Sequence, residues 1–434
     1  MYLTDRSAPP KPGAADQGRR RGPVTGVAPV VLVLGTVSLI TDISSEMVTA
    51  VLPLYLVSTL GFSPLGFGTL DGVYNGVSAL VQLTGGHLAD RVRNHKLMAG
   101  LGYGLSALCK PLLLLAGSVG ALGTVLALDR TGKGLRTAPR DAMISLSTPA
   151  ERQGRAFGVH RAMDTTGALL GPLTAFLILR AAADGYDAVF GVSACVAVLG
   201  VLVLVLFVPG RRRPAAGPGA SGASTTAAAD EGAGGRQPVR VREAVALLRL
   251  PRLRALAGCA ALLGLTTVSD AFVYLLLQRR TGIADEWFPL LPLGTAAVFL
   301  LLAVPVGALA DRIGRRTVFL AGHAVLLTGY ALLLWAPATP ALPFLVLALH
   351  GVFYAATDGV LPAALAGVVP DHLRASGLAI VGTSQALARF CCSLAFGAAW
   401  TMWGPGPALA GSAAGLLCCA TVAGVVLRPA DETR

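Results

Sequence analysis

The chain has 434 residues, of which 54% are apolar and only 13% are charged. So few charged residues cannot cover the surface of a soluble protein of this length, which excludes a soluble globular fold. Apolar stretches long enough to cross the hydrocarbon core of a bilayer as an α-helix, about 20 residues each, recur along nearly the whole chain. The sequence therefore predicts an all-α membrane protein with about twelve transmembrane helices.

The net charge of +12 would suggest a nucleic-acid partner in a soluble protein, but its distribution here indicates membrane topology. Lysine and arginine gather in every second polar segment, and the segments between them carry almost no charge or a mixed charge. The basic segments contain, in chain order, Arg20, Arg91, Arg152, Arg212, Arg312 and Arg374. The positive-inside rule places these segments in the cytoplasm. We therefore expect cytoplasmic termini, an even number of spans, a plasma (inner) membrane location and no nucleic-acid partner.

The polar and apolar segments divide the chain into two bundles. Residues 1–28 predict a disordered cytoplasmic leader, and the apolar run from Pro29 to Leu60 is too long for a cleaved signal peptide. We expect a six-helix bundle over residues 29–209, a flexible cytoplasmic linker over 210–252, a second six-helix bundle over 253–428 and a cytoplasmic tail over 429–434. The expected spans begin near Pro29, Leu65, Leu97, Gly120, Gln153, Asp187, Arg254, Trp287, Thr317, Leu342, Leu373 and Gly406.

The two halves repeat one another. Gly-His-Leu-Ala-Asp-Arg at 86–91 returns as Gly-Ala-Leu-Ala-Asp-Arg at 307–312, each time directly after the second expected span of its half. A duplicated six-helix unit explains this spacing. Such repeats place a substrate path at the interface of the two halves, near the middle of the bilayer.

Sites for metals, cofactors and catalysis are not expected. All seven cysteines lie in apolar segments without the spacing of a disulfide framework or a zinc site, so we interpret them as packing residues. The sequence contains no His-Glu-x-x-His and no Gly-x-Ser-x-Gly, and Gly132-Lys133-Gly134 lacks the flanking residues of a phosphate-binding loop. We therefore expect a protein that is not an enzyme.

The second copy of the repeated motif carries a family resemblance. Gly-Ala-Leu-Ala-Asp-Arg-Ile-Gly-Arg-Arg at 307–316 resembles the loop motif of the major facilitator superfamily, whereas the first copy has Arg93 where the family has glycine. The resemblance implies a transporter that works by alternating access, with loop charges that latch the cytoplasmic side when the outer side is open. The alternative is that these charges only fix the topology. The gating residues implied are Gly86, Asp90, Arg91, Gly307, Asp311, Arg312 and Arg315.

Two weaker motifs in the first half bear on coupling and direction. The segment from Arg130 to Gly134 resembles the fourth-span motif Arg-x-x-Gln-Gly, with Lys133 in place of glutamine, and in the family its arginine is associated with proton coupling. Gly167-x-x-x-Gly171-Pro172 resembles the fifth-span motif of drug-exporting antiporters but lacks the glycine pair that follows it. The resemblance to bacterial drug/proton antiporters therefore implies proton coupling and favours export.

Several charged residues lie inside the expected spans of the first half. Asp129, Lys133, Arg136 and Arg140 are spaced to share one helix face, which must point into the bundle because a charge in mid-bilayer costs about 3 kcal/mol. Burial and a nearby cation shift the protonation of a carboxylate in opposite directions, so carboxylates beside this stripe could exchange protons. A static ion network is the alternative. The proton-coupling candidates are Asp42, Glu46, Asp129, Arg130, Lys133 and Asp164.

The second half has fewer intramembrane polar residues, and we assign substrate contacts to both halves. The substrate-cavity candidates are Arg136, Arg161, Asp270, His350, Tyr354, Asp358, Gln385 and Arg389. For His350 the alternative is a histidine packed in the core. Because the stripe of the first half is net cationic, an anionic or zwitterionic substrate is conceivable, unless internal pairing neutralises the stripe.

These observations lead to two functional hypotheses. The first is a proton-coupled exporter of small organic or toxic compounds, and the alternative is a proton-coupled importer, or symporter, of a small metabolite or organic anion. A sensor or scaffold of the same fold is a third possibility. The expected partners are a small-molecule substrate, protons and the lipid bilayer, and the architecture predicts that a monomer is functional.

Overall fold

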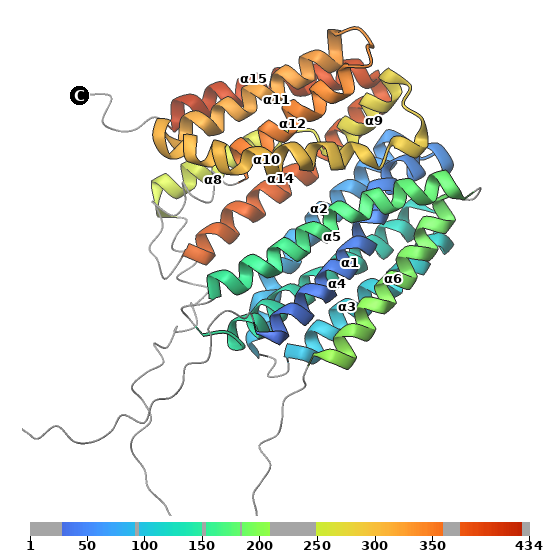
Figure 1. Ribbon diagram of the computed structural model, residues 1–434. Coiled ribbons are helices and arrows are strands. Elements are labelled where there is room, and N and C mark those ends of the chain that lie inside the picture. The colour runs from blue at the N-terminus through green and yellow to red at the C-terminus, as the bar shows by residue number, and fades with distance from the viewer. Residues whose placement is uncertain are drawn as a thin grey trace, which may run out of the picture.

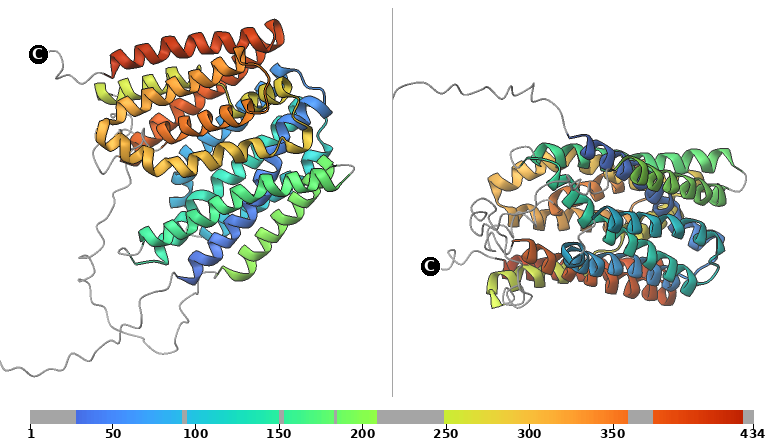
Figure 2. Two further views of the ribbon diagram at one scale, coloured as in Figure 1. Left: turned by 45° about the horizontal axis from the view of Figure 1, so that its top comes forward. Right: turned by 90° about the horizontal axis from the view of Figure 1, so that it is seen from below.

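The computed structural model describes residues 28–91, 95–149, 153–182, 185–208, 249–358 and 374–427, and this part of the chain is helical without a strand. Two helical bundles lie side by side, one built from the first half of the chain and one from the second (Figures 1 and 2). The expected leader, most of the expected linker and the expected tail lie outside the described residues. Their assignments stay predictions.

The N-terminal bundle contains six long helices. They are α1 (Pro29–Leu54, continued by a π-helical turn at Tyr55–Thr59), α2 (Pro64–Arg91), α3 (His95–Leu115), α4 (Val119–Leu146), α5 (Gln153–Ala181) and α6 (Gly185–Phe207). Helix α1 packs against α5 and α6, and α4 packs against α2 and α3. Glycines allow close packing: a Cβ at Gly167 would stand 2.5 Å from the Leu39 carbonyl oxygen, and one at Gly171 would stand 2.9 Å from that of Ile43. The Gly-x-x-x-Gly spacing of α5 thus fits α1 directly against it.

The C-terminal bundle contains seven described α-helices. They are α8 (Pro251–Gly264), α9 (Asp270–Thr281), α10 (Leu290–Ile313), α11 (Arg315–Trp335), α12 (Leu342–Thr357), α14 (Arg374–Trp403) and α15 (Pro405–Val426). A 3₁₀ turn at Asp285–Trp287 precedes α10. The expected linker boundary at residue 252 is slightly too late, because α8 already begins at Pro251.

The length of the helices and the apolar surface of the bundles indicate a membrane-spanning protein. Among the described helices, seven are long and apolar enough to cross a bilayer by themselves. Helices such as α4 are not apolar enough to be counted among these seven, because they carry buried charged residues. Large apolar side chains such as Leu115 and Val304 lie on the outside, about four-fifths exposed, where lipid would cover them. With α8 and α9 taken together, the described residues form six helical segments in each bundle, and the count of twelve spans stays a prediction.

The seventh expected span is broken, which the sequence did not predict. Residues 265–269 separate α8 from α9 and leave backbone groups without helical partners. Neighbouring helices supply those partners: the Val268 amide donates to the Tyr330 hydroxyl (2.8 Å), and the Cys392 thiol donates to the Thr267 carbonyl (3.4 Å). Non-helical backbone at membrane depth is tolerated where protein satisfies it in this way. The break places Asp270 in the first turn of α9.

Replacing Tyr330 with phenylalanine is expected to destabilise the protein by about 1–3 kcal/mol, because the buried Val268 amide would lose its acceptor. Thermal unfolding of the purified protein in detergent measures this loss. Tyr186→Phe is the matched control, because the buried Tyr186 hydroxyl makes no hydrogen bond among the described residues. Equal melting temperatures for the two variants would contradict the role assigned to Tyr330.

The two bundles contact each other through α2 of the first half and α14 of the second. Helices α1 and α8 begin, and α6 and α15 end, on the side predicted to be cytoplasmic; the opposite side is called the outer side below (Figure 1). On the outer side, the first turns of α2 pack against the last turns of α14, where the Leu65 amide donates to the Thr401 hydroxyl (3.0 Å). A Cβ at Gly397 would stand 2.5 Å from the Pro64 carbonyl oxygen.

Aromatic rings add to the closure of the outer side. Phe272 of α9 stacks edge-on against Phe67 of α2, with ring centroids 4.8 Å apart, and against Phe396 of α14 at the same distance. Between α5 and the start of α10, the rings of Phe176 and Trp287 lie 5.0 Å apart. These contacts close the side that is called outer here.

Candidate functional site

A cavity of about 370 Å³ lies between the two bundles. Helices α1 and α2 line it from the N-terminal half, and α9, α10, α12 and α14 line it from the C-terminal half. Its charged lining residues are Glu46, Asp71, Asp270, Asp358 and Arg389. The cavity therefore has the position predicted for the substrate path of a duplicated transporter.

Asp270 is the polar centre of the C-terminal wall. One of its carboxylate oxygens, Oδ1, accepts a hydrogen bond from the Tyr354 hydroxyl (2.5 Å) and lies 3.0 Å from Nε2 of His350. The Asp270 side chain is 42% exposed, whereas that of His350 is only 3% exposed and lies behind it. Helix α9 thus presents the carboxylate to the cavity, and α12 holds it through Tyr354, which also lines the cavity, and through the buried His350.

Arg389 and Asp358 lie beside this centre. Both line the cavity, and the Arg389 guanidinium is close enough to interact electrostatically with Asp270 and Asp358. The two residues also line a second, smaller cavity of about 120 Å³ inside the C-terminal bundle, together with Gln385 and His323. Gln385 is therefore placed beside Arg389, as its helical spacing predicts, but in the smaller cavity.

Asp71 and Lys110 belong to the polar interior and were missed in the sequence. Asp71 of α2 lines the central cavity, and its Oδ2 accepts a hydrogen bond from Ser393 of α14 (2.6 Å). Lys110 of α3 is buried and pairs with Asp129 at 3.1 Å. Both are ionisable residues inside expected spans, so the signal that identified the other candidates applied to them as well.

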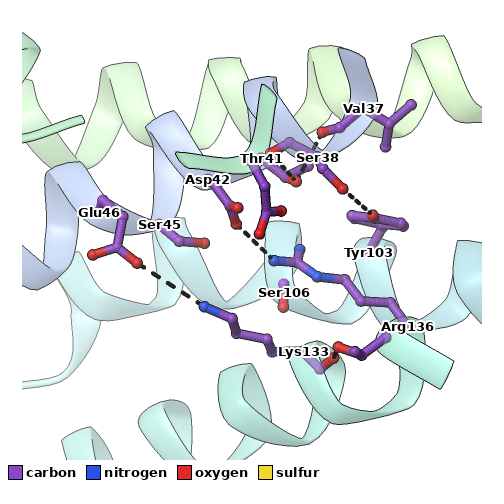
Figure 3. A network of polar contacts seen from close by, with 12 residues as sticks. Val37, Ser38, Thr41, Asp42, Ser45, Glu46, Tyr103, Ser106, Lys133 and Arg136 are labelled. Atoms are coloured by element: carbon purple, nitrogen blue, oxygen red, sulfur yellow. Dashed lines mark hydrogen bonds and ion pairs between the residues drawn. The ribbon is translucent and has the colours of Figure 1, made fainter. Parts of the chain in front are cut away.

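Two carboxylates of α1 face cations of α4 (Figure 3). Glu46 Oε1 lies 4.0 Å from Lys133 Nζ, and Asp42 Oδ1 lies 3.5 Å from the Arg136 guanidinium. The first pair is partly exposed and the second is nearly buried. Of these four side chains, only Glu46 lines the central cavity.

A deeper group of charges lies between α3 and α4. The carboxylate of Asp129 binds Lys110 through Oδ1 and the guanidinium of Arg130 through Oδ2. Arg130 also donates to the Tyr74 hydroxyl (2.8 Å). All three charged side chains are at most 5% exposed, and none lines the cavity.

The N-terminal network is balanced in charge. Arg140 lies 3.6 Å from Asp164 of α5 and 3.0 Å from Asp141, and Arg161 pairs with Asp164 from an exposed position. The buried or half-buried cations are Lys110, Arg130, Lys133, Arg136 and Arg140, and the carboxylates paired with them are Asp42, Glu46, Asp129, Asp141 and Asp164. The stripe on α4 is thus matched by carboxylates from other positions, and it does not make the central cavity cationic.

The repeated motif was expected in loops, but both copies form helix ends. Gly86–Arg91 lies in the last turns of α2, and Gly307–Arg312 lies in the last turns of α10. In the second copy, Asp311 pairs with Arg315 across the break at Gly314, which has a φ of 98° that favours glycine. Arg312 is exposed, and the side chains of Asp90 and Arg91 are outside the described part of the structure.

Comparison with known proteins agrees with this architecture. Residues 34–390 match the family model of the Major Facilitator Superfamily, and a second match covers residues 255–434. The fold and the cavity between its halves are those of a multi-pass membrane transporter. The chain belongs to the Major Facilitator Superfamily.

Relatives and solved structures are similar to the chain over most of its length. An uncharacterized MFS-type transporter of Methanocaldococcus jannaschii is 29% identical over 381 residues, which are 85% of this chain and 88% of that protein. The crystal structure of the nucleoside transporter NupG has a TM-score of 0.74 at 14% identity and covers 92% of this chain and 100% of its own. An inward-facing, unoccupied bacterial homolog of the human lysosomal transporter Spinster has a TM-score of 0.66 at 16% identity, covering 94% and 95%. At these identities the two structures show the fold alone.

Proposed function

We propose that this chain is a secondary active transporter that exports a small organic compound in exchange for protons, and that Asp270 is its main proton-exchanging group. The observation that carries the proposal is the position of Asp270: its carboxylate faces the cavity and accepts hydrogen bonds from Tyr354 and His350. A carboxylate that keeps these partners in one conformation and loses them in another changes its proton affinity between the two.

Glu46 is the proposed second participant. It lines the cavity from α1 and pairs only at 4.0 Å with Lys133, so it can exchange partners more easily than the buried carboxylates. Asp42, Asp129 and Asp164 are each held by arginine or lysine away from the cavity. In this proposal they, with Arg130, form the scaffold on which α1 and α4 move, and proton transfer takes place at the cavity wall.

The gating role of the repeated motif is part of the same proposal. In this arrangement, which is closed on the outer side, Asp311 pairs within its own segment, with Arg315. A latch that closes the cytoplasmic side would require new partners for Asp311, Arg312 and the first copy of the motif. We propose that this exchange of partners accompanies the opening of the outer side, in a monomer in the plasma membrane.

Asp270→Asn is expected to abolish proton movement that depends on a transported compound. The purified protein is placed in liposomes with a pH-sensitive dye inside, and cationic, zwitterionic and anionic compounds are added under an imposed proton gradient. Asp187→Asn removes an exposed carboxylate at the outer end of α6 and serves as the control, expected to behave like the unmodified protein.

The sign of the proton flux distinguishes export from import. Protons that move against the direction of the compound support exchange, and protons that move with it support the alternative, a symporter. A compound that crosses at an unchanged rate in Asp270→Asn while protons stay still in both proteins would show that Asp270 is structural and that the transporter is uncoupled.

A further inference from the structure

The charged lining of the central cavity is strongly unequal in sign. Four carboxylates line it, those of Glu46, Asp71, Asp270 and Asp358, and among the described lining residues Arg389 is the single arginine or lysine. The five cations of the N-terminal network lie outside the lining, and each is paired with a carboxylate, Lys110 and Arg130 with the same one, Asp129. The cavity therefore differs in charge from the network next to it.

One guanidinium cannot neutralise the carboxylates of the cavity. Arg389 interacts electrostatically with both Asp270 and Asp358, so its single positive charge is shared between two carboxylates. Asp270 also accepts a hydrogen bond from the Tyr354 hydroxyl, which carries no charge, and lies 3.0 Å from Nε2 of His350, which is positive only when protonated. Glu46 has a positive partner, Lys133, only at 4.0 Å. A carboxylate in such a place is stabilised by a cation or by a proton, since charge without a counter-charge is costly at this depth.

Beside a few threonine and serine hydroxyls, the remaining lining is apolar or aromatic. Helix α10 contributes Pro292, Ala296 and Phe299, which are spaced to share one face, and Phe288 and Tyr274 lie nearby. Aromatic faces attract organic cations through their quadrupole. The volume of about 370 Å³ is at the small end of the range for small-molecule sites.

From this lining we infer that the substrate is a small organic cation, with an amine or quaternary ammonium group attached to an aromatic or apolar body. The ammonium group lies among Glu46, Asp270 and Asp358, and the apolar body lies against the α10 face. This inference rests on the proposed function, because it takes the central cavity as the transport site. It also fits exchange with protons, since a proton and an organic cation would compete for the same carboxylates.

Binding to the full-length protein in detergent tests the substrate class. The probes are benzyltrimethylammonium and phenethylamine as cations, phenylacetate as an anion of similar size, and uridine as a neutral compound, with dissociation constants measured by equilibrium dialysis. We expect saturable binding of the cations and much weaker binding of phenylacetate and uridine. Glu46→Gln and Asp358→Asn should each weaken cation binding about tenfold, whereas the control Asp187→Asn should not change it.

The variant Arg389→Gln distinguishes a cationic substrate from an anionic one. For a cationic substrate the variant keeps or tightens binding, because it removes the one positive group of the described lining. For an anionic substrate it abolishes binding. Stronger binding of phenylacetate or uridine than of both cations, or no saturable binding of either cation, would overturn the inference. The proton-flux assay tests the proposed function separately. Cation binding without coupled proton movement would contradict the coupling but leave the substrate class intact. Proton-coupled transport of an anion would contradict the substrate class but leave the coupling intact.

Discussion

Gly68→Ala and Gly397→Ala are expected to open the outer side of the protein and to reduce transport strongly. A Cβ at Gly68 would collide with the Ser393 carbonyl oxygen, and one at Gly397 would stand 2.5 Å from the Pro64 carbonyl oxygen. Both obstacles are backbone atoms, so the clash cannot be relieved by turning a side chain. Overpacking of this kind costs about 1–3 kcal/mol, and here the cost applies only while α2 and α14 are in contact. Each substitution should therefore shift the population away from the outer-closed state by about 5- to 150-fold.

Cysteine labelling from the outer side measures this shift. Thr49, which lines the cavity, is replaced by cysteine in a protein whose seven native cysteines have been removed, and its reaction with an impermeant maleimide is followed. Gly104→Ala is the matched control, because a Cβ there meets no atom within 4 Å. Faster labelling with an unchanged melting temperature is the expected result. Unchanged labelling in both variants would mean that the contact between α2 and α14 does not set the closure of the outer side.

Much of the architecture could be predicted because it depends on local sequence. Apolar length predicts spans, and alternating basic segments predict orientation. The start of α12 at Leu342 was predicted as observed. The stripe on α4 could be placed on one face because helical spacing is a property of the segment itself.

The break between α8 and α9 could not be predicted because its cause is distant in the sequence. Residues 265–269 contain neither proline nor glycine, the usual markers of a break. Their backbone is stabilised by Tyr330, 62 positions after Val268, and by Cys392, 125 positions after Thr267. Only the packed structure shows that these partners exist.

The candidate site shows the same division between local and distant information. The shared face of His350 and Tyr354 follows from their spacing of four. Their common partner Asp270, some 80 positions earlier, does not. The sequence also suggested that the cation stripe of α4 would shape the substrate cavity. The structure shows instead that carboxylates of α1 and α5 pair with the cations of that stripe. The stripe itself does not line the cavity.

Asp129→Asn is expected to reduce the folded yield and to destabilise the protein by about 3–5 kcal/mol, because it leaves Lys110 and Arg130 buried without their counter-charge. Such a loss is a large part of the stability of a protein domain. Thermal unfolding in detergent and the monodisperse fraction after purification measure the effect. Asp141→Asn, which removes a carboxylate with a 42% exposed side chain from the same helix, should cost less than about 1 kcal/mol.

The double variant Lys110→Met/Asp129→Asn distinguishes a structural ion network from a proton carrier. If Asp129 serves to hold Lys110, the removal of both charges restores much of the lost stability, because no lysine is left buried without a partner. Proton-coupled transport should then return with it, since the cavity and Asp270 are unchanged. A double variant that is stable but cannot move protons would instead place Asp129 in the proton path. The sequence alone left these two roles open, and the isolation of Asp129 from the cavity wall favours the structural one.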